Sequence, residues 1–235
     1  MLPLLLAGCQ SAHDPQRIID QCIETHGGDR YRNCRIEFDF RTYHLSLYQR
    51  DGQFEYRRTY TDSTGARVDE ILTNKAVVRQ INGRAMALDS AQRSKYSNAV
   101  NAVSYFVLLP YKLSDRAVIK AYAGETTIDG QVYDKIRVSF SKDGGGKDFQ
   151  DVFFYWINQT SHTMDYLAYS EGGPRFRKAI NPQTVGGIRF QDYVNYKGDD
   201  ADSAVVGTFD QKYREGTLTI LSQIEQKNIK VTPVR

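Results

Sequence analysis

Apolar residues recur at two different periods along the chain, and each period predicts a type of element. Near the N-terminus they fall at helical spacing, at Ile18, Ile19, Cys22 and Ile23, and Gly27-Gly28 follows. Positions three and four apart mark one face of a helix, and glycine commonly ends helices. We therefore expect a first helix that packs this face against a larger element.

From Ile36 onward the period falls to two, which is typical of strands with one wet face. Apolar residues alternate with charged or polar ones at Ile36, Phe38 and Phe40, and again at Phe54, Tyr56 and Tyr60. The apolar parity then changes between Phe40 and Tyr43. This change predicts a β-bulge in a curved strand.

The connections between the strands carry hairpin signals. Asp51-Gly52, Asn82-Gly83 and Asp129-Gly130 are dipeptides that accept the positive φ of tight turns. The period returns to 3.6 between Ser90 and Leu109, just before Pro110, which predicts a second helix over residues 90–109. The sheet is therefore expected to be mostly antiparallel, with a helix inserted between two sets of strands.

Seven further strands are expected in the C-terminal half, at residues 118–123, 131–140, 152–157, 163–170, 175–180, 188–196 and 217–224. About ten strands with two helices predict a β-rich α+β fold, since a parallel sheet would need more helices. No linker or repeat divides the chain. We expect residues 17–235 to form a single domain.

The first nine residues form an apolar run that ends in Leu6-Ala7-Gly8-Cys9. This order matches a lipobox, in which the cysteine thiol accepts diacylglycerol and the preceding peptide is removed. No Lys or Arg precedes the run, unlike most secretory signals, and the alternative is an ordinary apolar N-terminus. We expect residues 1–9 to be a lipoprotein signal peptide with its lipidated cysteine, and residues 10–16 to be a tether.

Membrane attachment then depends on acyl chains, because the run is too short to span a bilayer. Gln10 follows Cys9, where many lipoproteins of the inner membrane carry Asp. This difference favours the outer membrane of a cell envelope, with the domain facing either the periplasm or the surface.

Charge and motifs exclude several classes of function. There are 31 Lys and Arg against 28 Asp and Glu, a net charge of +3, which is far from the excess of a nucleic-acid-binding protein. The four histidines lack metal-ligand spacing, and no phosphate-binding loop or nucleophile elbow is present. We expect no nucleic-acid partner, metal or cofactor. The sequence identifies no protein partner.

Cys22 and Cys34 remain besides the lipobox cysteine. In an oxidising compartment an even pair of cysteines can form a disulfide, here closing a loop of about a dozen residues. Two buried free thiols are the alternative, since the sequence does not give the distance between the two residues.

Five short motifs in order along the chain resemble those of an uncharacterised family of lipoproteins. They are His26-Gly27-Gly28, residues 109–113 (LPYKL), 151–157 (DVFFYWI), 164–169 (MDYLAY) and 187–190 (GIRF). The order of elements is similar to that of the lipoprotein-carrier superfamily of LolA and LolB proteins. That resemblance implies an incomplete antiparallel β-barrel with helices across its concave side, and a cavity that shields acyl chains.

Two groups of residues are candidates for ligand contacts. Tyr105, Phe106 and Leu109 are expected at the mouth of a dry cavity roofed by the second helix. Arg175, Arg177 and Arg189 lie on neighbouring predicted strands, where they could converge on a phosphate or carboxylate. The alternative for the arginines is a set of surface residues paired with Asp165, Glu171 and Asp192.

The leading hypothesis is a non-enzymatic lipoprotein that binds a lipid or another hydrophobic molecule in a half-barrel. An envelope hydrolase acting on a glycan or phospho-substrate is the second hypothesis, and it requires two carboxylates facing one cleft, from the set Glu37, Asp39 and Glu55. A structural module of an envelope complex is the third, and it predicts an exposed apolar patch.

Overall fold

The computed structural model describes residues 13–142, 151–170, 172–198 and 205–234. The predicted signal peptide and Cys9 lie outside these residues. The helices are α1 (Pro15–His26), α2 (Ser90–Val107) and α3 (Phe209–Arg214), with 3-10 turns at Gly28–Tyr31 and Tyr111–Ser114. The strands are β1 (Cys34–Phe40), β2 (Tyr43–Arg50), β3 (Gln53–Thr61), β4 (Arg67–Thr73), β5 (Val77–Ile81), β6 (Arg84–Ala85), β7 (Val118–Ile128), β8 (Gln131–Phe140), β9 (Phe153–Asn158), β10 (Met164–Tyr169), β11 (Arg175–Val185), β12 (Ile188–Lys197), β13 (Thr219–Ile224) and β14 (Lys227–Pro233).

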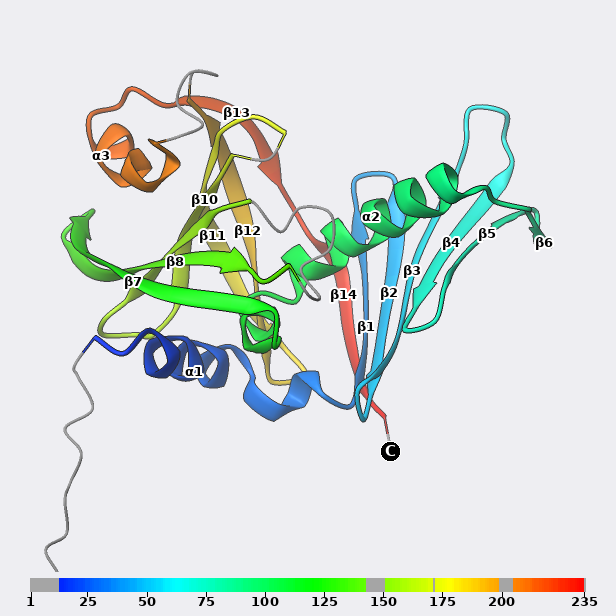
Figure 1. Cartoon of the computed structure of the whole chain (residues 1–235), viewed down its shortest axis with the longest axis horizontal. Coiled ribbons are helices and arrows are strands. Elements are labelled where there is room, and N and C mark those ends of the chain that lie inside the picture. Colours follow the sequence, from blue (N-terminus) through cyan, green and yellow to red (C-terminus); the bar gives the residue numbers. More distant parts are fainter. Residues whose placement is uncertain (1–12, 143–150, 171, 199–204, 235) are drawn as a thin grey trace, which may run out of the picture.

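The described strands form two antiparallel sheets of seven strands each. Sheet A has the order β14-β1-β2-β3-β4-β5-β6, and sheet B has the order β13-β12-β11-β10-β9-β8-β7. Neither sheet closes into a barrel among the described residues, so the predicted half-barrel is confirmed. It has more strands than the sequence indicated, and it is divided between two sheets (Figure 1).

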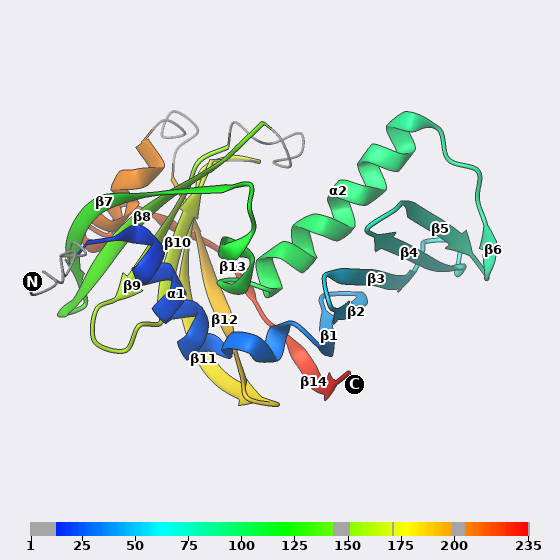
Figure 2. The same cartoon turned by 60° about the horizontal axis from the view of Figure 1, so that its bottom comes forward.

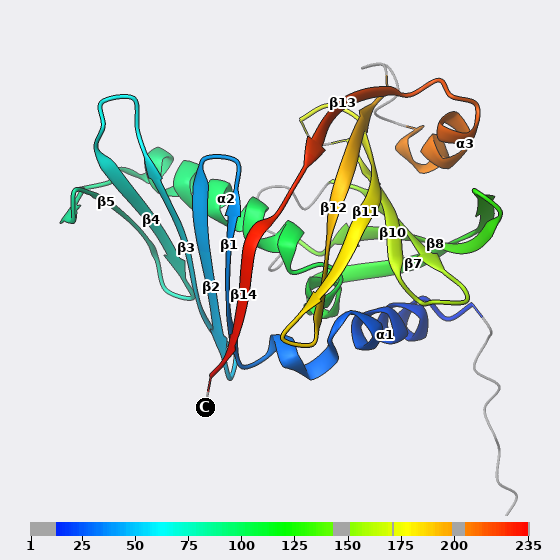
Figure 3. The ribbon, with the colours of Figure 1, turned by 180° about the vertical axis from the view of Figure 1, so that it is seen from behind.

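The two sheets are joined at the C-terminal end of the chain. β13 pairs with β12 in sheet B, and β14 then pairs with β1 in sheet A, so that two consecutive strands run from one sheet to the other (Figure 3). At the crossing, the Gln226 backbone N–H donates to Asp192 Oδ1 at 2.9 Å, and its side-chain amide donates to the Gln191 carbonyl at 3.0 Å. These buried bonds hold the crossing point against β12.

Sheet A has one apolar face and one polar face. The side chains of Ile36, Phe38, Leu45 and Leu47 are fully buried, whereas the intervening residues of β1 and β2 are mostly polar and point the other way. α2 lies across the apolar face, which we call the inner face (Figure 1). No helix of the described chain covers the opposite, outer face (Figure 3).

Sheet B is covered on both faces. α1 packs Ile18, Ile19 and Cys22 against one face, the inner face, on which Tyr155 and Leu167 lie (Figure 2). On the outer face Trp156 and Phe176 pack against Phe209 of α3. Because both faces are buried, β9 and β10 are apolar almost throughout, as in the motifs at residues 151–157 and 164–169.

The three dipeptide hairpin turns occur as predicted, with positive φ at both residues of each. The predicted bulge is wrong. β1 and β2 are separate strands in regular register, with Phe40 opposite Tyr43, and the parity changes because Arg41 and Thr42 form a two-residue turn with Arg41 at φ 56°. A non-glycine residue in this conformation is uncommon, so Arg41-Thr42 carries no turn signal that could be recognised from the sequence.

The two cysteines are free thiols in the structure, and both are buried. Cys22 faces the core between α1 and sheet B, whereas Cys34 begins β1 in the core of sheet A, where its thiol contacts the Tyr31 carbonyl at 3.5 Å. The structure therefore has the second of the two alternatives, because the two side chains belong to different parts of the core.

His26 ends α1 and ties it to β10. Its side chain is 1% exposed, and Nε2 accepts a hydrogen bond from the Met164 N–H at 3.2 Å. Burial, together with the charge of Arg189, lowers the pKa of His26 to about 3. The imidazole is therefore neutral in the folded protein at neutral pH.

This burial predicts a loss of stability in mild acid. The folded protein binds fewer protons at His26 than the unfolded chain does. The contribution of His26 to the unfolding free energy is therefore complete above about pH 6.5, and it falls as the pH drops toward 3. Between pH 7 and 5 the unfolding free energy should fall by about 2 kcal/mol more in the wild type than in His26→Gln, which keeps an acceptor. Urea unfolding at the two pH values measures the difference; an equal loss in both proteins contradicts it.

Candidate ligand-binding site

The C-terminal end of α2 meets a cluster of aromatic side chains on the inner face of sheet B. The cluster, here called the aromatic mouth, is half-buried and comprises Tyr105, Phe106, Phe140, Phe153 and Tyr169. Four of its rings are in contact in series, with centroids 6.2 Å apart for Tyr105–Phe140 and 5.8 Å apart for both Phe140–Phe153 and Phe153–Tyr169. Helix α2 and strands β8, β9 and β10 each contribute to this continuous apolar surface, which is partly open to solvent.

Phe106 occupies a central position because it packs against the cores of both sheets. Its ring lies 5.0 Å from that of Tyr193 and 4.3 Å from the Arg177 guanidinium carbon. The neighbouring Tyr105 hydroxyl is buried with no hydrogen-bond partner, and burial raises its pKa. An unsatisfied buried hydroxyl costs about 1–3 kcal/mol, so this contact between α2 and sheet B is imperfect.

Leu109 does not lie at an opening. It is 7% exposed and packs in the core of sheet B with Tyr155, so it fills the interior. Tyr105 and Phe106 are half-buried on the last turns of α2 and pack against the same core. The arrangement provides an apolar surface whose deeper space is occupied by the protein's own side chains.

The three candidate arginines do not converge. Arg175 and Arg177 are two residues apart on the inner face of β11, but Arg189 pairs with Thr184 near the start of β12. The residue opposite Arg177 on β12 is Asn195. Arg189 lies six residues from Asn195 along this strand, a distance of about 20 Å. Arg189 instead lies close enough to His26 and Cys22 to influence the pKa of each.

A buried ionic cluster lies beneath the N-terminal half of α2. Glu70 is fully buried and accepts hydrogen bonds from both Arg58 and Arg79, whose side chains are 12% and 15% exposed. Arg79 also lies over the ring of Tyr96 on α2, at 4.5 Å. This cluster was not predicted from the sequence, where its signal is charged residues at inner-face positions of β3, β4 and β5.

The α2 N-terminus is fixed separately by a capping box. Asp89 accepts from the Gln92 N–H at 2.8 Å, and the Gln92 side chain accepts from the Asp89 N–H at 3.0 Å. Such reciprocal caps satisfy two otherwise unpaired donors. The capping box fixes the start of the helix, Tyr96 holds the first half of α2 to sheet A through Arg79 and the apolar core, and aromatic packing holds the last turns to sheet B.

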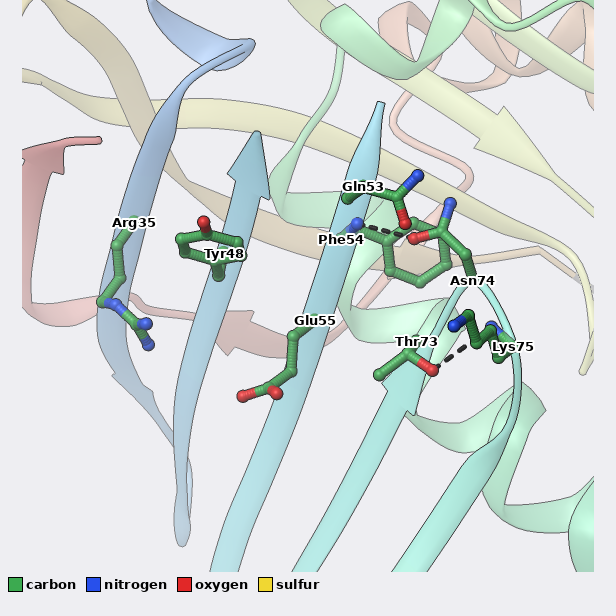
Figure 4. Close-up of a pocket in the computed structure, with 8 residues that line it drawn as sticks. All are labelled: Arg35, Tyr48, Gln53, Phe54, Glu55, Thr73, Asn74 and Lys75. Atoms are coloured by element: carbon green, nitrogen blue, oxygen red, sulfur yellow. Dashed lines mark hydrogen bonds between the residues drawn. The ribbon is translucent and has the colours of Figure 1, made fainter. Parts of the chain in front are cut away.

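Two open pockets lie on sheet A away from the mouth. The first, of about 530 Å³, is on the outer face among Arg35, Tyr48 and Glu55 and the β4–β5 turn (Figure 4). The second, of about 510 Å³, is beside the β1–β2 turn and includes Asp39. Each pocket contains one carboxylate, so neither has the paired acids that the hydrolase hypothesis requires.

The described ranges contain no group of three or more His, Cys, Asp or Glu side chains arranged to hold a metal ion. Within the same ranges, no helix has the length and apolar character needed to cross a bilayer. The large exposed apolar side chains are distributed over several elements, among them Ile119 on β7, Val132 on β8, and the neighbours Ile220 and Leu221 on β13.

A solved structure shares this architecture. A LolA-superfamily protein from Nitrosomonas europaea superposes with a TM-score of 0.52 at 9% identity, over 94% of this chain and 93% of that chain. An outer-membrane lipoprotein-sorting protein domain from Vibrio parahaemolyticus gives 0.49 at 7% identity, over 93% and 94% of the two chains. At such identities the likeness defines the fold alone, and the fold is of the LolA type.

The chain belongs to DUF6503, a family of unknown function whose model matches residues 1–226. No curated protein matches the sequence. The predicted resemblance to an uncharacterised family with a LolA-like fold is therefore confirmed, and the family has no described activity to transfer.

The ionic cluster gives a testable prediction about stability. Replacing Glu70 by Gln leaves two arginines in a buried site without their counter-charge, which typically costs about 3–5 kcal/mol. The matched control is Glu55→Gln on the outer face, whose side chain is 40% exposed and whose loss should cost less than about 1 kcal/mol. Urea unfolding of both variants makes the comparison; a loss for Glu70→Gln as small as the control's refutes the role assigned to the cluster.

Proposed function

We propose that this chain is a cell-envelope lipoprotein, acylated at Cys9, that binds a lipid or another hydrophobic ligand at the aromatic mouth. The observation that carries the proposal is the half-buried aromatic surface between α2 and sheet B. Soluble proteins normally bury or disperse such surfaces, and large exposed apolar ones often mark binding sites. The LolA-type fold and the lipobox support the same function.

The Phe106 ring fills the space that we assign to the ligand. A ligand therefore displaces this ring from the Tyr193 contact and takes over its apolar neighbours. The unpartnered Tyr105 hydroxyl makes that exchange less costly, because the contact being broken is not fully satisfied. The acyl anchor keeps the domain at the membrane, the outer membrane in our proposal, where hydrophobic ligands are concentrated.

Removing the Phe106 ring should increase affinity for an apolar probe. Burying a phenylalanine side chain contributes about 1.5–3 kcal/mol, and a ligand that no longer displaces it should bind about tenfold more tightly. Titration of the full chain carrying Cys9→Ser with the neutral fluorophore N-phenyl-1-naphthylamine measures this for Phe106→Ala.

Phe154→Ala is the matched control, because Phe154 is also half-buried but belongs to the outer-face cluster of sheet B. It should leave the affinity unchanged. Equal effects of the two substitutions, or no binding by the unsubstituted chain, contradict the proposed site. Native mass spectrometry and organic extraction of the same protein then identify any ligand retained from the cell.

The anchor has its own test. Cys9→Ser should abolish incorporation of radiolabelled palmitate and move the protein from the membrane fraction to the soluble fraction, because the hydroxyl cannot replace the thiol as the acyl acceptor. Cys22→Ser is the control, since that thiol is buried in the folded domain. Continued labelling of Cys9→Ser rejects the assignment.

A further inference from the structure

Arg177 lies beside the aromatic mouth and has an unusual environment. Its guanidinium carbon lies over two rings, 4.3 Å from the centroid of Phe106 and 5.0 Å from that of Tyr169, and one of its NH₂ groups donates to the Tyr169 hydroxyl. Its Nε is closed off from solvent and has no hydrogen-bond partner. A charged group in such a place normally has all its donors paired.

No carboxylate forms an ion pair with Arg177 in the part of the chain that the structure describes. The other arginines beneath α2 differ, since Arg58 and Arg79 share the buried Glu70. Burial lowers the pKa of Arg177, and the like charge of Arg175 acts in the same direction. Arg175, two residues away on the same face, adds a second positive charge. Among the described residues its guanidinium donates to the carbonyls of Pro174 and Gly172 and forms no ion pair.

The stronger ring contact of Arg177 depends on the position of Phe106 at the end of α2. The face of this ring stabilises a cation through its quadrupole. When a ligand displaces Phe106, the guanidinium loses its stronger ring contact. An acid on the ligand replaces that contact with a charge-assisted hydrogen bond, which is among the strongest available to arginine.

We infer that Arg177 binds the acidic head group of an amphiphile whose hydrocarbon chain occupies the aromatic mouth. The inference rests on the proposed function and narrows its ligand class to anionic amphiphiles, with a carboxylate or a phosphate on an acyl chain. Arg177 is the residue that distinguishes such a ligand from a neutral molecule of the same length.

Competition between two ligands that differ only in charge tests the inference. The full chain carrying Cys9→Ser is loaded with N-phenyl-1-naphthylamine, which is then displaced by dodecanoate or by 1-dodecanol, both below their aggregation limits. Dodecanoate should compete at least about tenfold better than dodecanol, as expected for a charge-assisted contact. Arg177→Gln should remove this preference while leaving dodecanol and the probe unaffected, and Arg177→Lys should retain part of it.

Arg57→Gln is the matched control, because Arg57 lies on the outer face of sheet A with its side chain 38% exposed. This variant should prefer dodecanoate over dodecanol as strongly as the unsubstituted chain does. Equal competition by the two ligands, or a preference for dodecanoate that persists in Arg177→Gln, overturns the head-group inference. Neither result contradicts the proposed binding of hydrophobic ligands at the aromatic mouth. Displacement by millimolar acetate or inorganic phosphate alone also overturns it, because the site then recognises a free anion. Absence of any probe binding rejects the proposed function as well.

Discussion

The packing of the C-terminal end of α2 against both sheets is the contact on which the rest of the structure depends. Each sheet has an apolar inner face that must be covered, and the sheets are otherwise joined mainly through the β13–β14 crossing and through α1 and its following turn. Phe106 packs against both cores, as Phe40 of β1 also does, so these two side chains connect them. Because Phe106 also lies at the half-buried aromatic mouth, one of the contacts that join the sheets is at the place where a ligand is proposed to enter.

The surroundings of the two halves of α2 differ. Beneath the first half, the Arg58–Glu70–Arg79 cluster pairs its charges and contacts the helix through Tyr96. Around the last turns the Tyr105 hydroxyl and the Arg177 Nε are buried without partners, as are a few other buried atoms such as the Tyr31 hydroxyl and the Arg189 Nε. Tyr105 and Arg177 differ from those others in lying beside the half-buried aromatic mouth, and this position supports ligand exchange at the C-terminal half.

Much of the fold could be predicted because its elements carry strong local patterns. The α2 boundaries follow from the 3.6-residue period between Asp89 and Pro110, and the hairpins from the Asp-Gly and Asn-Gly pairs. Elements with weak patterns were not predicted. β14 was overlooked because its sequence, KNIKVTP, is rich in polar residues. The second half of β11 was overlooked because Pro182 interrupts the strand, and its register against β12 shifts between Ile180 and Gln183.

The candidate site was only partly accessible to sequence reasoning. Helical spacing placed Tyr105 and Phe106 on α2 near the second set of strands, but it could not show that Leu109 turns into the core. The arginines were grouped by proximity in the sequence, whereas strand register separates Arg189 from Arg177. The role of Glu70 depended on pairing three strands correctly, which only the tertiary structure provides.

Photoaffinity labelling of the full chain with a diazirine-bearing fatty acid, followed by peptide mapping, tests the central claim most directly, because it reports where a hydrophobic ligand binds. The account predicts labels on the segments that contain Phe106, Phe153 and Tyr169, and loss of these labels when unlabelled dodecanoate is added. Labelling concentrated at the outer pocket around Tyr48 and Phe54, or spread evenly over the surface, would contradict it.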